Sequence, residues 1–345
     1  MTVQDDAGVK PGGGAVTTPP AGTAVTTPPA GAAGAASPGE RAGTAARLWR
    51  YVLGSYPPAF YLTYAVTWAL GVSALFALAD PRVAAWRPDG AALVTAATFG
   101  ITLLLMRAVD DIRDLDYDRV HNPGRPLPAG AVRVRDLGLL IAAGTAAVLA
   151  LNAARGVVLA VLAAQLGYAL LMLLADRRWG WPPEEKLGLA TLVSAPVQIL
   201  LNLYLYAGML QKEGLAPSLH AVPALFTVTA AFLHLEYARK VTRVTRPGER
   251  GYAVAYGADR TAVFAVAGAV ISVVLSLTLT RPWQDAPGAA PWGWLALPPL
   301  VFVAFGAHRF WRARASRWPL LPAALFLLTT FLAYLAAGVL GKDLT

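Results

Sequence analysis

Five aspartates lie within nine positions of the chain, at residues 110, 111, 114, 116 and 118. Carboxylates this close repel one another unless a cation neutralises them. On a helix, Asp111, Asp114 and Asp118 would share one face, within about 60° of arc, whereas Asp116 would point largely away. Converging carboxylate oxygens suit a hard divalent cation such as Mg²⁺. We therefore expect Asp111, Asp114 and Asp118 to hold magnesium, and the alternative is a solvated loop whose acids pair with nearby arginines.

The residues after this acidic cluster read NPGRPLPAG, from Asn122 to Gly130. Together, Asp110 to Asp118 and this loop resemble the first signature of the UbiA-type intramembrane prenyltransferase family, which reads NDxxDxxxD followed by NPxRPLPxG. The leading Asn of the family pattern is Asp110 here, and an acid at that position can still ligate a metal. The resemblance extends over roughly residues 46 to 345.

The resemblance implies a reaction as well as a fold. It implies an all-α bundle of about nine transmembrane helices that transfers a prenyl group from an allylic isoprenyl diphosphate to a small or lipid-like acceptor, with Mg²⁺ as cofactor. Asp111, Asp114 and Asp118 would then be catalytic as the metal ligands. The residues expected to bind the substrate beside them are Asp110, Asn122 and Arg125.

A second polar segment, residues 234–243, stands where that family keeps another aspartate-rich signature, but it contains no aspartate. If its helix continues, one acid and three cations share a face within about 100° of arc, and such a face can bind a diphosphate. These residues are Glu236, Arg239, Lys240 and Arg243. We expect Glu236 to hold a second magnesium, Arg239 and Lys240 to be catalytic, and Arg243 to bind substrate. Two alternatives remain. Glu236 could pair only with Lys240, or the basic residues could be there only because cytoplasmic loops of membrane proteins are rich in Lys and Arg.

Few polar side chains interrupt the apolar runs of the chain. Gln198 and Asn202 are one helical turn apart and need partners in hydrocarbon, so they are expected to face the interior. Substrate binding and helix-to-helix hydrogen bonding are both open for them. Tyr252, in the polar loop after residue 243, is a further substrate-binding candidate. Aromatic residues that could line a cavity for an allylic cation, or simply pack, are Tyr61, Tyr64, Trp68, Tyr204 and Tyr206.

The composition indicates that membrane-spanning helices position these residues. The chain has 345 residues, of which 56% are hydrophobic and only 14% charged. A soluble globular protein has about 25% charged residues, so this balance excludes that class. The chain has no Cys, which excludes disulfides, thiolate metal sites and a cysteine nucleophile. Nine apolar runs are long enough to span a bilayer, at residues 58–79, 91–110, 136–154, 156–175, 187–210, 218–238, 261–280, 290–310 and 319–340.

Charge predicts the orientation of this bundle. A cytoplasmic amino terminus places all but six of the 29 basic residues on the cytoplasmic side, in agreement with the positive-inside rule. The six on the opposite side are Arg82, Arg87, Arg155, Lys212, Arg281 and Lys342. The net charge of +9 then reflects topology, and no nucleic-acid partner is expected. We expect an integral protein of a bacterial plasma membrane, surrounded by membrane lipid, with its active-site loops on the cytoplasmic side.

Residues 1–45 form a separate region rich in Pro, Gly and Thr, in which AVTTPPAG occurs twice. Such a segment cannot bury a core, so we predict a disordered tail before a nine-helix domain over residues 46–345. The predicted function is prenyl transfer from an isoprenyl diphosphate to an unknown acceptor. A terpene cyclase that closes the prenyl chain on itself is the main alternative. A transporter is disfavoured because no ionisable group is evident near the midplane of the spans.

Overall fold

The computed structural model describes residues 43–183, 186–245, 251–284 and 291–341, and these segments are almost entirely helical. The predicted tail lies outside the described residues up to residue 42, and the first helix begins at Thr44, two residues before the predicted domain boundary. The helices are α1 (Thr44–Ser55), α2 (Pro58–Ala79), α3 (Gly90–Arg113), α4 (Leu115–His121), α5 (Val134–Leu151), α6 (Gly156–Trp179), α7 (Leu187–Glu213), α8 (Ala221–Ala238), α9 (Tyr252–Tyr256), α10 (Ala258–Thr280), η1 (Pro291–Ala296), α11 (Leu300–Ala307), η2 (His308–Arg312) and α12 (Leu320–Gly341).

Eight helices of the described part are long and apolar enough to cross a membrane: α2, α3, α5, α6, α7, α8, α10 and α12. They confirm eight of the nine predicted spans to within a few residues. The prediction for residues 290–310 as one helix is wrong, because η1, α11 and η2 divide this segment. The break falls at Pro298 and Pro299, which lack the backbone N–H that a continuous helix needs. The chain is an all-α, integral membrane protein.

The local sequence explains where several of these helices begin and end. Pro58 occupies the first turn of α2, where its missing N–H costs no hydrogen bond. Asp89 caps α3 by accepting a hydrogen bond from the Ala92 N–H at 3.0 Å. α6 and α7 both end at a glycine in the left-handed conformation, Gly180 with φ 59° and Gly214 with φ 64°.

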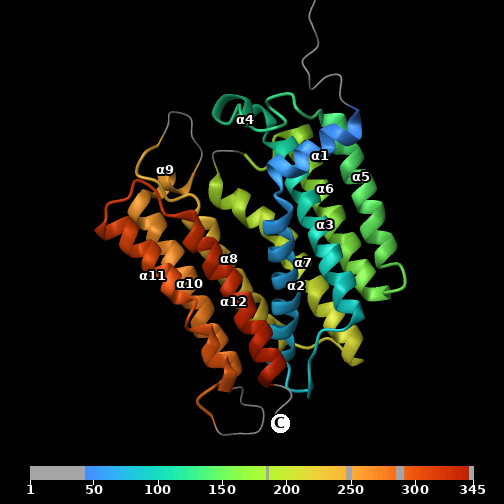
Figure 1. Ribbon diagram of the computed structural model, residues 1–345, viewed down its shortest axis with the longest axis vertical. Coiled ribbons are helices and arrows are strands. Elements are labelled where there is room, and N and C mark those ends of the chain that lie inside the picture. Colours follow the sequence, from blue (N-terminus) through green and yellow to red (C-terminus); the bar gives the residue numbers. More distant parts are fainter. Residues whose placement is uncertain (1–42, 184–185, 246–250, 285–290, 342–345) are drawn as a thin grey trace, which may run out of the picture.

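Glycines allow two pairs of helices to approach closely. A Cβ on Gly71 of α2 would collide with the backbone of Phe331 in α12. A Cβ on Gly268 of α10 would lie 2.9 Å from the carbonyl oxygen of Ala230 in α8. Small residues at such contacts are the usual means by which membrane helices pack, since lipid provides no hydrophobic drive between them. These contacts join α2 to α12 and α8 to α10, and α12 lies next to α2 near the centre of the bundle in Figure 1.

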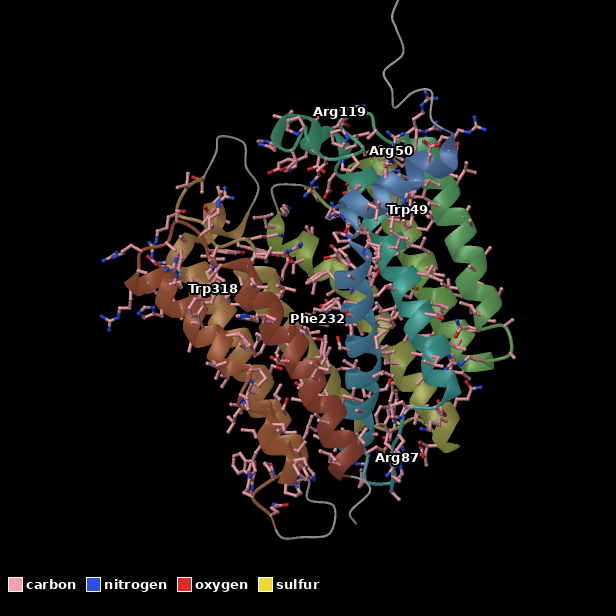
Figure 2. All side chains as sticks on the ribbon, in the orientation of Figure 1. Trp49, Arg50, Arg87, Arg119, Phe232 and Trp318 are labelled. Atoms are coloured by element: carbon pink, nitrogen blue, oxygen red, sulfur yellow. The ribbon has the colours of Figure 1, made fainter. Side chains whose placement is uncertain are left out.

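An aromatic cluster fills the interior between these pairs. Trp68 of α2 lies 4.9 Å from Phe99, 4.2 Å from Phe232 and 6.0 Å from Phe331, measured between ring centroids. Its indole N–H also donates to Asn202 Oδ1 of α7 at 3.0 Å. Figure 2 shows Phe232 within the bundle, below the end at which α1, α4 and α9 gather in Figure 1. The short helices therefore place their polar residues above a buried aromatic interior.

Candidate active site

The five aspartates lie where α3 meets α4, a region we call the acidic junction (residues 110–118). The helix is interrupted at Asp114, whose φ and ψ of −86° and 9° separate the two segments. The prediction of one continuous helix is therefore wrong. Electrostatics explains the break in part, because successive carboxylates on one helical face would repel one another.

Asp111 and Asp118 form the buried half of the acidic junction, with exposed fractions of 3% and 1%. Arg125 joins them: its Nη1 lies 2.5 Å from Asp118 Oδ2 and 3.9 Å from Asp111 Oδ1. Asn122 Nδ2 donates to the other oxygen of Asp118 at 2.8 Å. The predicted substrate residues Arg125 and Asn122 thus hold the acids in this structure, and they fix the NPGRPLPAG loop against α4.

Sequence reasoning missed Tyr51 of α1, which contributes to the same buried half. Its hydroxyl donates to Asp111 Oδ2 at 2.9 Å, and the residue is fully buried. The Asp111 carboxylate raises the pKa of the Tyr51 phenol, but burial raises it more. The phenol therefore stays a donor. Arg107 lies on the other side of Asp111, with Nη2 at 2.9 Å from Oδ1. No local motif marks Tyr51, because it is 60 positions away in the sequence.

Asp110 and Asp114 form the accessible half of the acidic junction. Their side chains are 50% and 43% exposed, and Arg113 contacts both, at 3.1 Å and 3.0 Å. Asp116 is 92% exposed and pairs only with Arg119 among the contacts found, at 2.7 Å. The prediction that Asp116 points away is thus confirmed. The grouping of Asp114 with the buried acids is not, because Asp114 is partly exposed and shares Arg113 with Asp110, one helical turn before it.

The second polar segment forms a compact arrangement at the end of α8, which we call the cationic turn (Glu236, Arg239 and Lys240). Glu236 Oε2 lies 2.5 Å from Arg239 Nη2, and Oε1 lies 2.6 Å from Lys240 Nζ. Each carboxylate oxygen of Glu236 therefore faces a cation. This geometry supports an ion-pairing role for Glu236, and it includes Arg239 as well as Lys240.

Arg243 does not share the face of the cationic turn, contrary to the prediction from a continued helix. α8 ends at Ala238, and residues 242 and 317 then form an isolated β-bridge. The guanidinium of Arg243 turns to Asp259 at 2.9 Å and stacks over the Phe310 ring at 4.2 Å. Its neighbours therefore belong to α10 and η2 rather than to the acidic junction.

Tyr252 of α9 packs beside the cationic turn. The Lys240 ammonium lies 4.7 Å from the centre of its ring, and its hydroxyl forms a short hydrogen bond with Thr191 of α7. Burial raises the pKa of the Tyr252 phenol, so the group remains protonated and can donate a hydrogen bond. α9 thus anchors Lys240 between α8 and α7.

The acidic junction and the cationic turn lie at the same end of the bundle. α4, which follows the acidic junction, and α9, whose Tyr252 packs against Lys240 of the cationic turn, both lie at the upper end in Figure 1. Tyr64 of α2 leads from this end toward the aromatic interior, with its ring centroid 5.6 Å from that of Trp68. Two segments more than 100 positions apart in the sequence are therefore brought to one end of the bundle, above this interior.

The polar and aromatic candidates of the spans divide between the two ends of the bundle. Asn202 is fully buried and bonds Trp68, but its amide nitrogen has no hydrogen-bond partner among the described residues, and neither has that of Gln198. Tyr204 and Tyr206 bond groups at the end remote from the acidic junction, namely Asn152 and Ser218. Those two tyrosines serve packing, whereas Tyr61 stacks on Tyr56.

An apolar groove of about 210 Å³ opens between the first turns of α2 and α12. Tyr64, which lines this groove, also contacts Trp68 of the aromatic interior. The residues that line it are Ala59, Phe60, Thr63, Tyr64, Leu321, Ala324, Leu325 and Leu328. A hydrocarbon chain fits such a lining because nearly all of the surface is apolar.

Comparison with known proteins places this arrangement among related molecules. No family model matches the chain. A curated relative, digeranylgeranylglyceryl phosphate synthase of Methanoculleus marisnigri, is 29% identical over 209 residues, which cover 58% of this chain and 68% of the relative. A solved structure, the apo form of a UbiA homologue from Aeropyrum pernix K1, matches with a TM-score of 0.57 and 19% identity over 81% of this chain and 98% of its own. The chain has the UbiA-type fold. These findings together confirm the resemblance to the UbiA-type prenyltransferase family.

The side chains at the acidic junction of this UbiA-type chain fit magnesium by their chemistry. All of the acidic donors are carboxylates, which suit a hard cation that completes its shell with water and phosphate oxygens. Asp110 and Asp114 are accessible, whereas Asp111 Oδ1 is buried and faces Arg107 Nη2 at 2.9 Å. In the described part of the chain, however, no group of three or more acids or histidines converges on one point. The fit is therefore to a cation held by one or two carboxylates, not by three.

Proposed function

We propose that this protein transfers a prenyl group from an allylic isoprenyl diphosphate to a lipid-like acceptor within the membrane. The observation that carries the proposal is that the acidic junction and the cationic turn lie at the same end of the bundle, above an aromatic interior. A diphosphate needs cations, a metal-binding acid needs phosphate oxygens to complete the shell, and an allylic chain needs an apolar cavity. The described residues supply all three at one end of the bundle.

The accessible pair, Asp110 and Asp114, would hold magnesium, and the bound ion would neutralise charge on the diphosphate. Asp111 and Asp118 position that pair from below, because Arg125, Asn122 and Tyr51 already engage their oxygens. This assignment differs from the sequence prediction, because Asp110 joins Asp114 as a ligand and Asp111 and Asp118 become positioning residues. Glu236 has a corresponding role, holding Arg239 and Lys240 in place for the phosphate oxygens.

The reaction breaks the bond between the allylic carbon and the diphosphate oxygen, and the electron pair leaves with the diphosphate. Arg239 and Lys240 stabilise the charge that develops on this leaving group. The allylic cation then lies above the rings of Tyr64 and Trp68, whose π faces stabilise positive charge. A nucleophilic oxygen or carbon of the acceptor forms the new bond and releases a proton. The apolar groove excludes water, which would otherwise capture the cation.

The acceptor class is inferred from the surroundings and the relative together. The groove between α2 and α12 opens along helices that cross the membrane, so an acceptor dissolved in the bilayer has direct access. The Methanoculleus relative is a digeranylgeranylglyceryl phosphate synthase, and this name describes a glyceryl phosphate that carries prenyl groups. We infer that the acceptor of this chain is likewise an amphiphile with a polar head and a lipid body.

The test is a transfer assay with purified full-length protein in lipid nanodiscs. Radiolabelled farnesyl and geranylgeranyl diphosphates are supplied with Mg²⁺, with and without an added lipid extract as acceptor source. The proposal predicts label in a prenylated lipid only when the extract is present. A cyclic hydrocarbon or alcohol formed without the extract would instead identify a terpene cyclase. Unreacted diphosphate under all conditions would contradict both activities.

A further inference from the structure

A polar pocket, separate from the apolar groove, lies at the end of the bundle opposite the acidic junction. Figure 2 shows Arg87 at this end and Arg119 of α4 at the other. α2, α3 and α7 and the loop before α3 surround the pocket, whose volume is about 40 Å³. A single water needs roughly 10–15 Å³ by the same measure, so the space accepts a group of several atoms. The activity proposed above does not use this pocket.

Arg155 forms the floor of the pocket. Its Nη1 donates to Thr95 at 3.1 Å, Asn152 at 2.9 Å and Tyr204 at 3.2 Å. These three bonds fix the guanidinium plane but use only one of its nitrogens. The Nη2 lies beside Gly208, where a Cβ would come within 3.1 Å of it. The absence of a side chain at Gly208, which also lines the pocket, leaves Nη2 room for a ligand.

Two further cations line the rim. Lys212 of α7 stands over the Trp86 ring, 5.7 Å from its centre, and bonds the Arg87 carbonyl oxygen. The Arg87 side chain lines the pocket as well. One acid accompanies them: Asp89 lies 3.7 Å from Lys212 Nζ, and its other oxygen caps α3. Three basic residues and one acidic residue therefore line this small space.

Membrane topology does not explain this gathering of charge. The positive-inside rule concentrates basic residues at the end that carries the acidic junction, and it leaves six of 29 for the opposite side. Three of those six line this one pocket. Basic residues placed only by the membrane interface would each face the lipid headgroups at a different position around the bundle. Convergence on one space indicates an anionic ligand of a particular size.

We propose that this pocket binds the phosphodiester headgroup of an anionic phospholipid. Guanidinium and ammonium groups are the usual partners of phosphate oxygens, and the pocket offers both types. The source is a lipid because α2, α3 and α7 all cross the membrane and because Leu70, Leu205 and Met209 form apolar walls beside the cations. Arg155 contacts the phosphate from below, and Lys212 and Arg87 close over it from the rim.

The test counts bound lipids on the intact full-length protein by native mass spectrometry in detergent. Phosphatidylglycerol, phosphatidylcholine and inorganic phosphate are titrated separately. The proposal predicts one saturable site that prefers phosphatidylglycerol. Lys212→Gln should raise its dissociation constant about tenfold or more, the effect of one lost charge-assisted contact. Lys212→Arg should retain binding. Arg155 is left unchanged, since its bonds to Asn152 and Tyr204 support the fold.

Arg281→Gln is the matched control, because it removes one positive charge from the same side of the predicted topology without touching the pocket. Arg87→Gln is a second pocket variant in case Lys212→Gln lowers expression. Equal binding of phosphatidylglycerol and phosphatidylcholine would overturn the proposal, as would equal losses in Lys212→Gln and Arg281→Gln. Phosphate binding without a preference for phosphatidylglycerol would overturn the assignment to lipid. Prenyl transfer is measured separately, so its outcome does not decide this one.

Discussion

Glu236→Gln separates the two roles that the sequence leaves open for this residue. In the structure both carboxylate oxygens face cations, at 2.5 Å from Arg239 and 2.6 Å from Lys240. A carboxylate engaged in this way has no oxygen directed at a metal. We therefore predict that the magnesium concentration giving half-maximal activity is unchanged in Glu236→Gln. Each partly exposed ion pair stabilises by about 0.2–1 kcal/mol, so the variant should lose less than about 2 kcal/mol of unfolding free energy.

Lys240→Gln measures the other side of the same arrangement. If Lys240 contacts the diphosphate, its loss removes a charge-assisted hydrogen bond of roughly 1.5–3 kcal/mol and raises the KM for the diphosphate about ten- to a hundredfold. The assay is prenyl transfer with titration of Mg²⁺ at saturating diphosphate, and of diphosphate at saturating Mg²⁺. Arg119→Gln, at an exposed cation of the same end, is the control. A raised magnesium midpoint in Glu236→Gln would refute the ion-pairing role and restore Glu236 as a metal ligand.

Three further predictions concern the acidic junction and the tail. Asp114→Asn should reduce turnover at least a hundredfold at fixed Mg²⁺. Asp116→Asn should retain near-wild-type rates, because the Asp116 side chain is 92% exposed. Similar losses of turnover in both variants would contradict the division of the acids by exposure. Tyr51→Phe leaves Asp111 Oδ2 without its donor and should lower stability by about 1–3 kcal/mol, measured as a shift of the unfolding midpoint in detergent. Removal of residues 1–40 should leave transfer rates unchanged in the nanodisc assay, and a loss of membrane insertion would show that this segment has a further role.

Hydrophobic length alone predicted most of the bundle. The run at 58–79 coincides with α2, and the short turn near Arg155 separates α5 from α6 as expected. Length could not predict the division of the segment after residue 290, because its apolar composition continues through Pro298 and Pro299. There the absence of two backbone donors outweighs the hydrophobic pattern.

The site was predictable in its residue types but not in its grouping. Helical periodicity assigned Asp114 to the face of Asp111, and it assigned Arg243 to the face of Glu236. The Arg243 assignment failed because α8 ends at Ala238, and periodicity carries no information beyond the last turn. The Asp114 assignment failed in burial, since Asp114 is 43% exposed whereas Asp111 is buried. The Tyr51 contact with Asp111 was out of reach for a different reason. It is a tertiary contact between segments with no shared pattern.

The most direct test of the account is a binding titration with a non-hydrolysable allylic thiodiphosphate. The acidic junction and the cationic turn are proposed to bind one diphosphate together, so each should be needed for tight binding in the presence of Mg²⁺. The account predicts a single bound ligand, with dissociation constants at least tenfold higher in Asp114→Asn and in Arg239→Gln than in the wild type or Asp116→Asn. Wild-type affinity in either of the first two variants would contradict it.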